Sequence, residues 1–476
     1  MLFVYNTLSR SKEEFKPISG KKVRMFVCGQ TVYDDAHLGH AKNYINFDVI
    51  ARWLRRSGYD LRYIQNITDI DDKIIKRAAE EGTDPIELAR RYEARFMEDM
   101  EAIGVKAGVD EYPRSHDFIE VMKNQIQLLL DNGYAYVLGS DIYYDVSKFP
   151  DYTTLSGMKV EELEKHRIEP KEGKRNPYDF ALWKGSKPGE PSWKIKIRPE
   201  GGEMELEGRP GWHIEDTAIT YAMFGKQYDI HGGAIELIFP HHTNEIAQAE
   251  AAFKAKPFVK YWFHSGIMLI KGEKMSKSLK NFIRIRDLLK EYNAETLRML
   301  VCSTHYRKDM AYTDALIKNA SSRLRYAYAS LSIFYNMEAE ESGIACAEVD
   351  AIIKELKKRF NEAMDDDFNT PLALSLLSSA IEKLRAYAES YPKISTKSKE
   401  SAVNEIISMC GVFGIMQKET YKEKLSPSEA KLIKERESLR KEKKFDDSDR
   451  IREILNREFG IIVEDSEYGT IWYRQR

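Results

Sequence analysis

One stretch near the amino terminus limits the possible fold more than any other part of the sequence. Residues 23–28 are apolar and β-branched, and a glycine-containing loop separates them from the amphipathic stretch 39–57. A second apolar run, 61–67, follows Gly58. This order of strand, helix and strand predicts a parallel, doubly wound α/β sheet, in which ligands bind at the carboxyl ends of the strands.

The same pattern returns later in the chain. Runs 228–231 and 261–270 are predicted strands, and 234–254 is a predicted helix between them. Proline and glycine break up the region 109–211 into mixed segments, which indicates an insertion between the two halves of the sheet.

The last third of the chain has a different character. Residues 314–413 show almost continuous helical periodicity, with Leu372, Leu374, Leu376 and Leu377 as an example, and predict a helical bundle. After Ser426 and Pro427 we predict a helix rich in Lys and Glu, a second helix over 446–459, and short strands at 461–463 and 470–473.

Composition narrows the class of protein. The chain has 476 residues, of which 42% are hydrophobic and 32% charged, with a net charge of −2. We therefore expect several globular domains, and any nucleic acid must be bound by local basic patches. The four cysteines, in no paired spacing, favour a reducing compartment, and neither a signal peptide nor a membrane-spanning run is apparent. We expect a cytoplasmic protein with no membrane partner.

Two short motifs carry groups that suit a nucleotide. His37, Gly39 and His40 follow the first predicted strand at the start of a helix, where backbone N–H groups favour anions. Lys274 and Lys277 belong to a KMSKS segment that follows a late strand, and two ammonium groups there suit a triphosphate. Taken singly, each motif is equally consistent with structural histidines or with a solvated surface loop.

Three further residues are candidates for a metal site. Cys28 ends the first predicted strand, where a thiol is either a metal ligand, a reactive group or an inert buried side chain. His241 and Glu245 are one helical turn apart and so can face one ion, although an ion-paired helix face would have the same spacing.

HxGH and KMSKS together resemble the paired signature of class I aminoacyl-tRNA synthetases. The resemblance narrows to the cysteinyl branch over motifs that stand in the family's order through most of the chain. These are FVCGQTVYDDAHLGHA, NITDIDDKI, RPGWHIE, DIHGG, FPHH, KMSKSLKN, MDDDFNTPLAL and FDDSDRIREIL.

The resemblance implies an enzyme, a cysteine–tRNA ligase. It would activate L-cysteine with ATP and transfer it to the 3′ end of tRNA(Cys). The family's zinc ligands map to Cys28, Asp216, His241 and Glu245. Asp216 stands where the family has a cysteine, so an oxygen donor replaces a soft thiolate. A zinc ion with an open position would take the thiolate of cysteine in preference to the hydroxyl of serine.

The resemblance also implies the other site residues. Those expected around ATP, which would bind with Mg²⁺, are Thr31, His37, Gly39, His40, Gly232, Gly233, Glu236 and Lys277. The expected catalytic residues are His37, His40, Lys274 and Lys277. Glu236 stands where an Asp is usual. Those expected around the amino acid are Cys28, Gly29, Thr68, Trp212 and His231.

Combined with the resemblance, the sequence patterns predict five parts. They are a Rossmann-like catalytic domain (1–108 and 212–260), a connective insertion (109–211), a KMSKS and stem-contact region (261–313), a tRNA-contacting helical bundle (314–420) and a small mixed α/β anticodon-binding domain (421–476). Near the end, Trp472, Tyr473 and Arg474 would stack on unpaired bases, or the strand would pack its Trp inward. We expect a monomer.

Two rival functions are consistent with part of the pattern. A ligase that joins activated cysteine to an amine on a sugar would share the catalytic scaffold, but it would not need the carboxyl-terminal segment. A noncatalytic tRNA-binding relative would be expected to have eroded HxGH or KMSKS residues, and both motifs are intact.

Overall fold

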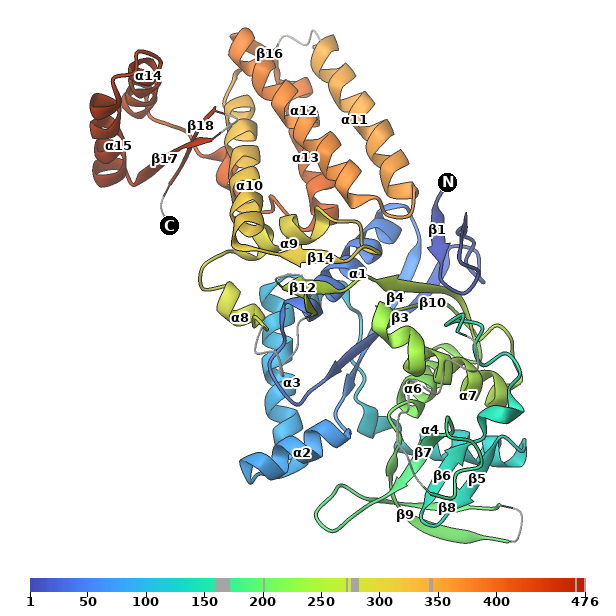
Figure 1. Ribbon diagram of the computed structural model, residues 1–476. Helices are drawn as coiled ribbons and strands as arrows, with labels where there is room; N and C mark the ends of the chain where they lie inside the picture. Colours follow the sequence, from blue (N-terminus) through green and yellow to red (C-terminus); the bar gives the residue numbers. More distant parts are fainter. Residues whose placement is uncertain are drawn as a thin grey trace. The chain divides into compact units, whose positions relative to one another are not determined.

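The computed structural model describes most of the chain (Figure 1). The described residues are 1–158, 172–199, 202–270, 273–274, 282–341, 346–466 and 469–474. They form two compact units. Unit 1 comprises Met1–Glu291 and Tyr306–Ala311, and unit 2 comprises Tyr292–His305 and Tyr312–Arg476.

A four-stranded parallel sheet forms the centre of unit 1. Its strands are β3 (Lys22–Thr31), β4 (Asp60–Thr68), β10 (Tyr228–Ala234) and β11 (Val259–Ser265), in the spatial order β11-β10-β3-β4. The chain winds outward from β3 to β4 and, after the insertion, outward again from β10 to β11. The prediction of a doubly wound parallel sheet is confirmed, and its topological switch point lies between β3 and β10.

The first βαβ unit matches its prediction. Helix α1 (Leu38–Arg56) connects β3 to β4 and is buried on all sides over most of its length, with Phe47 and Trp53 among its buried side chains. Two further helices, α2 (Asp72–Glu81) and α3 (Pro85–Ala102), follow β4. Asp71 and Asp84 cap them by accepting hydrogen bonds from backbone N–H groups of the first turn. Helix α6 (Ile214–Phe224) precedes β10.

Two predicted elements of the second half differ from the structure. The expected helix 234–254 begins only at α7 (Thr243–Phe253), because Phe239 is extended and Pro240 has no N–H to donate. A short 3₁₀ turn, Ile235–Leu237, and a π-helical turn, Ile238–His242, precede it. The expected strand 261–270 is two strands, β11 and β12 (Met268–Ile270), separated at Gly266.

The break at Gly266 has a packing cause. A Cβ there would lie 2.4 Å from the backbone of Lys308, and the Gly266 N–H donates to the carbonyl of Tyr306 at 2.9 Å. The buried ammonium of Lys42, on α1, donates to the Gly266 carbonyl at 2.6 Å. These contacts turn the chain out of the parallel sheet. Strand β12 then joins a small sheet in the order β13-β12-β14, with β13 at Glu273–Lys274 and β14 at Met310–Tyr312.

The region 109–211 carries its own antiparallel sheet, in the order β5-β6-β7-β9-β8. Its strands are β5 (Ala135–Leu138), β6 (Asp141–Tyr144), β7 (Phe180–Gly185), β8 (Trp193–Ile197) and β9 (Met204–Pro210), preceded by α4 (Ile119–Asp131). Tyr144 and Trp183 are buried in the same hydrophobic core as Phe26 and Ile64 of the parallel sheet. The predicted interruption of the α/β pattern is therefore real, and the inserted sheet shares a core with the sheet it interrupts.

Two smaller elements complete unit 1. Strands β1 (Phe3–Asn6) and β2 (Ser11–Glu14) form an antiparallel pair. Helix α8 (Ile285–Leu288) follows the KMSKS segment.

Unit 2 contains the predicted helical bundle. Its helices are α9 (Ala294–Cys302), α10 (Asp314–Tyr335), α11 (Ala347–Asp365), α12 (Thr370–Ser390) and α13 (Thr396–Phe413), with a short parallel pair, β15 (Glu338–Glu340) and β16 (Lys393–Ser395). Of the leucines that suggested the bundle, Leu374 and Leu377 are buried, whereas Leu372 is 44% exposed. The periodicity therefore predicted the helix correctly but assigned too many of its residues to the buried face.

The predicted terminal helices and strands are also present. They are α14 (Pro427–Lys441), α15 (Phe445–Phe459), β17 (Ile461–Ser466) and β18 (Gly469–Arg474). Ser426 and Glu429 form a capping box at the start of α14. Leu455 is buried in a small core of this region, and Trp472 packs against that core. Among the described residues, no helix is long and apolar enough to cross a membrane.

The terminal core gives a stability prediction. Leu455→Ala should lower the free energy of unfolding of this region by about 2–5 kcal/mol, because it removes a fully buried side chain and leaves a cavity. Phe445→Ala, on the same helix but 52% exposed, is the control and should cost less than about 1 kcal/mol. Thermal and urea unfolding of both variants would measure this. Equal losses for the two variants would contradict the assigned core.

Candidate active site and metal centre

A group of buried polar side chains gathers where the winding of the sheet reverses. Cys28 lies on β3, Thr68 ends β4 and His231 lies on β10, beside Phe26 in the sheet register. Asp216 comes from the first turn of α6. All four are buried. The residues that the sequence assigned to the amino acid and to the metal thus converge on the carboxyl-end edge of one sheet, where open α/β sheets bind ligands.

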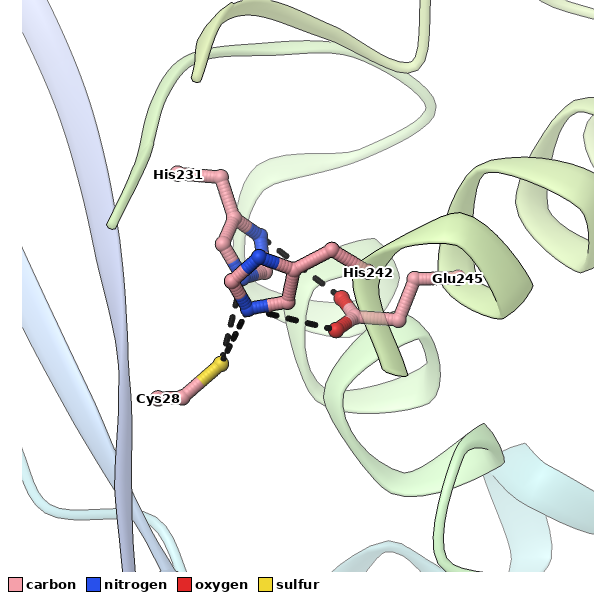
Figure 2. Close-up of side chains that lie close together, drawn as sticks. All are labelled: Cys28, His231, His242 and Glu245. Carbon is pink, nitrogen blue, oxygen red and sulfur yellow. Dashed lines mark hydrogen bonds and ion pairs between the residues drawn. The ribbon is translucent and has the colours of Figure 1, made fainter. Parts of the chain in front are cut away.

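The Cys28 thiol is the centre of this group. Its Sγ lies 3.2 Å from Asp216 Oδ2, 3.2 Å from His231 Nε2 and 3.1 Å from His242 Nε2. Figure 2 shows the two imidazoles between the thiol and the carboxylate of Glu245. Oxygen, nitrogen and sulfur atoms of the kinds that bind metals therefore face one small volume.

The four predicted zinc ligands lie together. One donor atom each from Cys28, Asp216, His241 and Glu245 falls within 4.8 Å of the others. His241 Nε2 is 3.1 Å from Asp216 Oδ2 and 3.2 Å from Glu245 Oε1. Around a tetrahedral zinc ion with bonds of about 2.0–2.3 Å, donor atoms lie about 3.3–3.8 Å apart, so these donors are close to the spacing that one ion needs.

A second set of four donors overlaps the first. Cys28, His231, His242 and Glu245 also lie within 4.8 Å of one another (Figure 2). The sequence analysis assigned no role to His242. The signal available for it was its position next to His241 in the FPHH motif, whereas its approach to Cys28 depends on the irregular turn before α7.

His241 and His242 both have partners that fix the orientation of their rings. His242 Nδ1 lies 2.8 Å from His264 Nε2, and His264 Nδ1 lies 2.8 Å from Thr7 Oγ1. His241 Nδ1 lies 3.0 Å from His213 Nδ1, and Trp212, predicted to lie near the amino acid, stacks on the His241 ring with centroids 4.3 Å apart. A partner on one ring nitrogen orients the other nitrogen toward a metal, as outer ligand shells usually do.

The electrostatics of this group fit a cation. Both carboxylate oxygens of Glu245 are buried and accept no hydrogen bond from the described residues. Burial, together with Asp216 and Glu215, raises the pKa of Glu245 well above its usual value. Burial, with Asp216 and Glu245 nearby, likewise raises the pKa of the Cys28 thiol. A divalent metal would compensate these buried anionic groups, so the residues present suit zinc.

The nearby imidazoles are suited to metal binding as well. Burial, reinforced by neighbouring histidines, lowers the pKa of His231 and His242 well below the usual value. Burial lowers the pKa of His264 to about 3. These rings are therefore neutral near pH 7, and a neutral imidazole is the form that binds metals.

Strand β4 positions Asp216 through Asn66. The Asn66 amide donates to Asp216 Oδ1 at 2.7 Å, and its carbonyl oxygen accepts from the Gly29 N–H at 2.6 Å. A Cβ at Gly29 would lie 1.6 Å from the Asn66 backbone oxygen, so only glycine permits this approach. Thr68 donates to Glu215 at 2.7 Å, which anchors the residue before Asp216. Asn66 is a second residue that sequence reasoning missed.

The HxGH histidines form the start of α1. His37 Nδ1 accepts from the Gly39 N–H at 3.1 Å, and His40 Nδ1 accepts from the His37 N–H at 3.3 Å. The two rings stack with centroids 3.8 Å apart. Because each Nδ1 accepts, each neutral ring carries its proton on Nε2, and that N–H can donate to a phosphate at the helix start.

The other residues predicted to bind ATP lie at strand ends. Thr31 ends β3 and pairs with Thr68. Gly232 and Gly233 lie on β10, where added Cβ atoms would come within 2.3 Å of the Phe47 ring and 2.8 Å of the His242 ring. Packing alone thus requires glycine at both positions. Glu236 is exposed in the turn that follows β10.

The lysine motif is only partly described. Lys274 lies in β13, paired through its backbone with Leu269. Lys277 lies outside the described residues, and its proposed role stays a prediction.

Two family descriptions match this chain. One is "tRNA synthetases class I (C) catalytic domain", over residues 14–322. The other is "DALR domain", over residues 359–417, within the helical bundle.

Curated relatives match along nearly the whole chain. A cysteine–tRNA ligase of Thermococcus gammatolerans is 46% identical over 99% of this chain and 98% of its own length. One of Pyrococcus horikoshii is 47% identical over 99% of each chain, and one of Thermodesulfovibrio yellowstonii is 42% identical over 98% and 99%.

Solved structures share the fold at low sequence identity. Mycobacterium tuberculosis methionyl-tRNA synthetase aligns with a TM-score of 0.59 at 18% identity, covering 83% of this chain and 89% of its own. The leucyl enzyme agnB2 LeuRS of Agrobacterium radiobacter aligns with a TM-score of 0.61 at 11% identity, covering 84% of each chain. With a matching catalytic-domain family over more than half its length and full-length relatives above 40% identity, this chain belongs to the cysteine–tRNA ligase family of class I aminoacyl-tRNA synthetases.

Proposed function

We propose that this chain activates L-cysteine with ATP and transfers the cysteinyl group to the 3′-terminal adenosine of tRNA(Cys). The observation that carries the proposal is the buried group of thiol, carboxylate and imidazole donors at the switch point of the parallel sheet. Family membership supplies the reaction type, and this group supplies a reason for the choice of cysteine.

We propose Cys28, Asp216, His241 and Glu245 as the zinc ligands. When bound, zinc would supply a Lewis acid that prefers a thiolate to a hydroxyl. Asp216 is held in place by Asn66, which supports its use as an oxygen ligand. The set with His231 and His242 in place of Asp216 and His241 is the competing arrangement, and it replaces the hard oxygen of Asp216 with an imidazole.

The other site residues would orient the substrates and stabilise the charge on the phosphates. Gly29, Thr68, Trp212 and His231 are proposed to surround the bound amino acid, whose carboxylate attacks the α-phosphate of ATP in line. The Nε2–H groups of His37 and His40 would stabilise charge that develops on the transferring group. Lys274 and Lys277 would neutralise the departing pyrophosphate, and Mg²⁺ that enters with ATP would neutralise further phosphate charge.

Transfer requires tRNA binding outside the catalytic sheet. The helical bundle, with its DALR match, and the small terminal domain are proposed to contact the stem and the anticodon. Trp472 packs partly into the terminal core, which supports a structural role for its ring. We propose a monomer that acts in the cytoplasm, where ATP and tRNA are available.

The activity itself is tested by charging. The purified chain should attach cysteine to its cognate tRNA and should discriminate against serine by about 10⁴ or more in kcat/KM, because serine lacks the thiol for which the site is built. A small amine on a sugar is the competing acceptor. Acylation of that amine without charging would favour the sugar ligase, and tRNA binding without either reaction would favour a noncatalytic role.

The nucleotide site is tested at His40. His40→Asn should slow cysteine-dependent ATP–pyrophosphate exchange by about 10²–10³ in kcat, since it removes a donor aimed at developing charge. Zinc content and the KM for cysteine should stay near the wild-type values, because His40 lies outside both donor sets. Unchanged exchange would show that His40 only caps the helix.

The metal site is tested by affinity for zinc. Glu245→Gln should weaken zinc binding more than about 100-fold, since loss of an outer-shell partner alone costs about 10–100-fold. Asp216→Cys should tighten binding, because thiolate is the softer ligand. Glu295→Gln changes a buried carboxylate of unit 2, outside both sets, and is the matched control. Chelator competition with metal analysis gives the affinities.

The same measurement separates the two donor sets. Asp216→Asn should weaken zinc binding strongly if Asp216 is a ligand. Unchanged binding in Asp216→Asn with a large loss in His242→Ala would instead favour the second set. Equal losses in Glu295→Gln and Glu245→Gln would contradict both sets.

A further inference from the structure

One buried carboxylate beside the HxGH motif belongs to neither donor set. Asp35 lies in the loop between β3 and α1, two residues before His37, and its side chain is 5% exposed. Three guanidinium groups surround it, from Arg95 on α3 and from Arg284 and Arg286, which follow the KMSKS segment.

The three guanidinium groups lie at different distances from the Asp35 carboxylate. Arg95 forms a bidentate ion pair with Asp35, with Nε 2.5 Å from Asp35 Oδ1 and Nη2 2.9 Å from Oδ2. Arg284 Nε lies 3.3 Å from Oδ2, and Arg286 Nε lies 3.7 Å from Oδ1. One carboxylate thus joins three chain segments: the HxGH loop, α3 and the stretch after the lysine motif.

Backbone hydrogen bonds hold the same two segments side by side. The Leu38 N–H donates to the Ile283 carbonyl at 3.0 Å, and the Ile285 N–H donates to the Ala36 carbonyl at 3.1 Å. His37 and Arg284 form an antiparallel bridge. The catalytic-loop histidine and the residue that contacts Asp35 are therefore direct neighbours across a short ladder.

A second carboxylate completes the cluster. Arg286 Nη2 lies 3.1 Å from Asp99 Oδ1 and also donates to the Arg95 carbonyl at 3.1 Å. Burial works against ionisation of Asp35, but Arg95, Arg286 and Arg284 outweigh it and hold the pKa of that carboxyl below its usual value. Removal of the Asp35 charge would leave three like charges close together, of which Arg286 would keep Asp99 as a partner.

We propose that Asp35 is a positioning residue for cysteine activation: through Arg284 and Arg286 it fixes the stretch that follows the KMSKS lysines against the HxGH loop. The inference rests on the proposed function, because it assigns both motifs to one nucleotide. Asp35 touches no substrate in this account. Its effect reaches ATP through the register of the bridge between His37 and Arg284.

Asp35→Asn tests this with two readouts on the full-length chain. Cysteine-dependent ATP–pyrophosphate exchange should show a KM for ATP or a kcat that is worse by about 10- to 100-fold, the cost of a small misplacement of catalytic groups. The KM for cysteine and the zinc content should not change, because Asp35 lies outside both donor sets. Hydrogen exchange at the Leu38 and Ile285 amides should become faster.

Three variants separate positioning from stability. Asp145→Asn removes the charge of another buried carboxylate, paired with Arg175 in the insertion, and should leave ATP kinetics unchanged at a similar loss of thermal stability. Asp35→Glu keeps the charge and should restore part of the ATP kinetics. Arg284→Gln combined with Asp35→Asn should be little worse than Asp35→Asn alone, because residues that act through one contact are not additive.

The possible outcomes distinguish a failure of this inference from a failure of the proposed function. Wild-type exchange with unchanged ATP kinetics in Asp35→Asn would overturn the inference and leave the proposed function standing. Absence of cysteine-dependent exchange in the wild type would overturn the proposed function and with it the catalytic role of Asp35. A change in ATP kinetics that Asp145→Asn reproduces at equal stability would show a structural role only.

Discussion

Anionic groups buried around one thiol are the constraint on which the rest of this structure depends. Glu245, Asp216 and Glu215 are all nearly inaccessible to water and lie close to Cys28. Without a cation, such groups hold a proton or raise the free energy of the folded state. Glu215 is satisfied by hydroxyl donors, and Asp216 by Asn66, but Glu245 has no hydrogen-bond donor in the described part of the chain. The folded chain therefore presents a preformed site for a metal.

The surrounding elements hold the donor side chains of that site in position. Gly29 lets β3 and β4 approach closely enough for Asn66 to reach Asp216, and Gly233 leaves space for the His242 ring. The irregular turn before α7 brings the His242 ring to the Cys28 thiol and the His241 ring to Asp216. At the nucleotide end, Asp35 and its arginines hold the HxGH loop beside the stretch after the lysine motif. We propose that this edge of the sheet binds a metal at one end and the phosphates of ATP at the other.

Much of this was predictable from local pattern. The strand, helix and strand over 22–68 follow from hydrophobic periodicity, and Cys28, His241 and Glu245 follow from their motifs and from helical spacing. The prediction of a helix that begins near 234 was wrong because Phe239 and Pro240 interrupt the helix. The prediction of one long strand was wrong because the chain turns at Gly266, close to Lys308. His242, Asn66 and Asp35 were missed because each acts through partners on other strands or helices. No periodicity within one segment encodes such contacts.

X-ray absorption at the zinc edge of the purified chain would show which donor atoms bind the metal. We expect bound zinc with one sulfur neighbour, from Cys28, and nitrogen and oxygen neighbours for the remaining ligands. One imidazole in that shell corresponds to the set with Asp216 and His241, and two correspond to the set with His231 and His242. A zinc-free protein that is fully folded, or a bound zinc with no sulfur neighbour, would contradict the account.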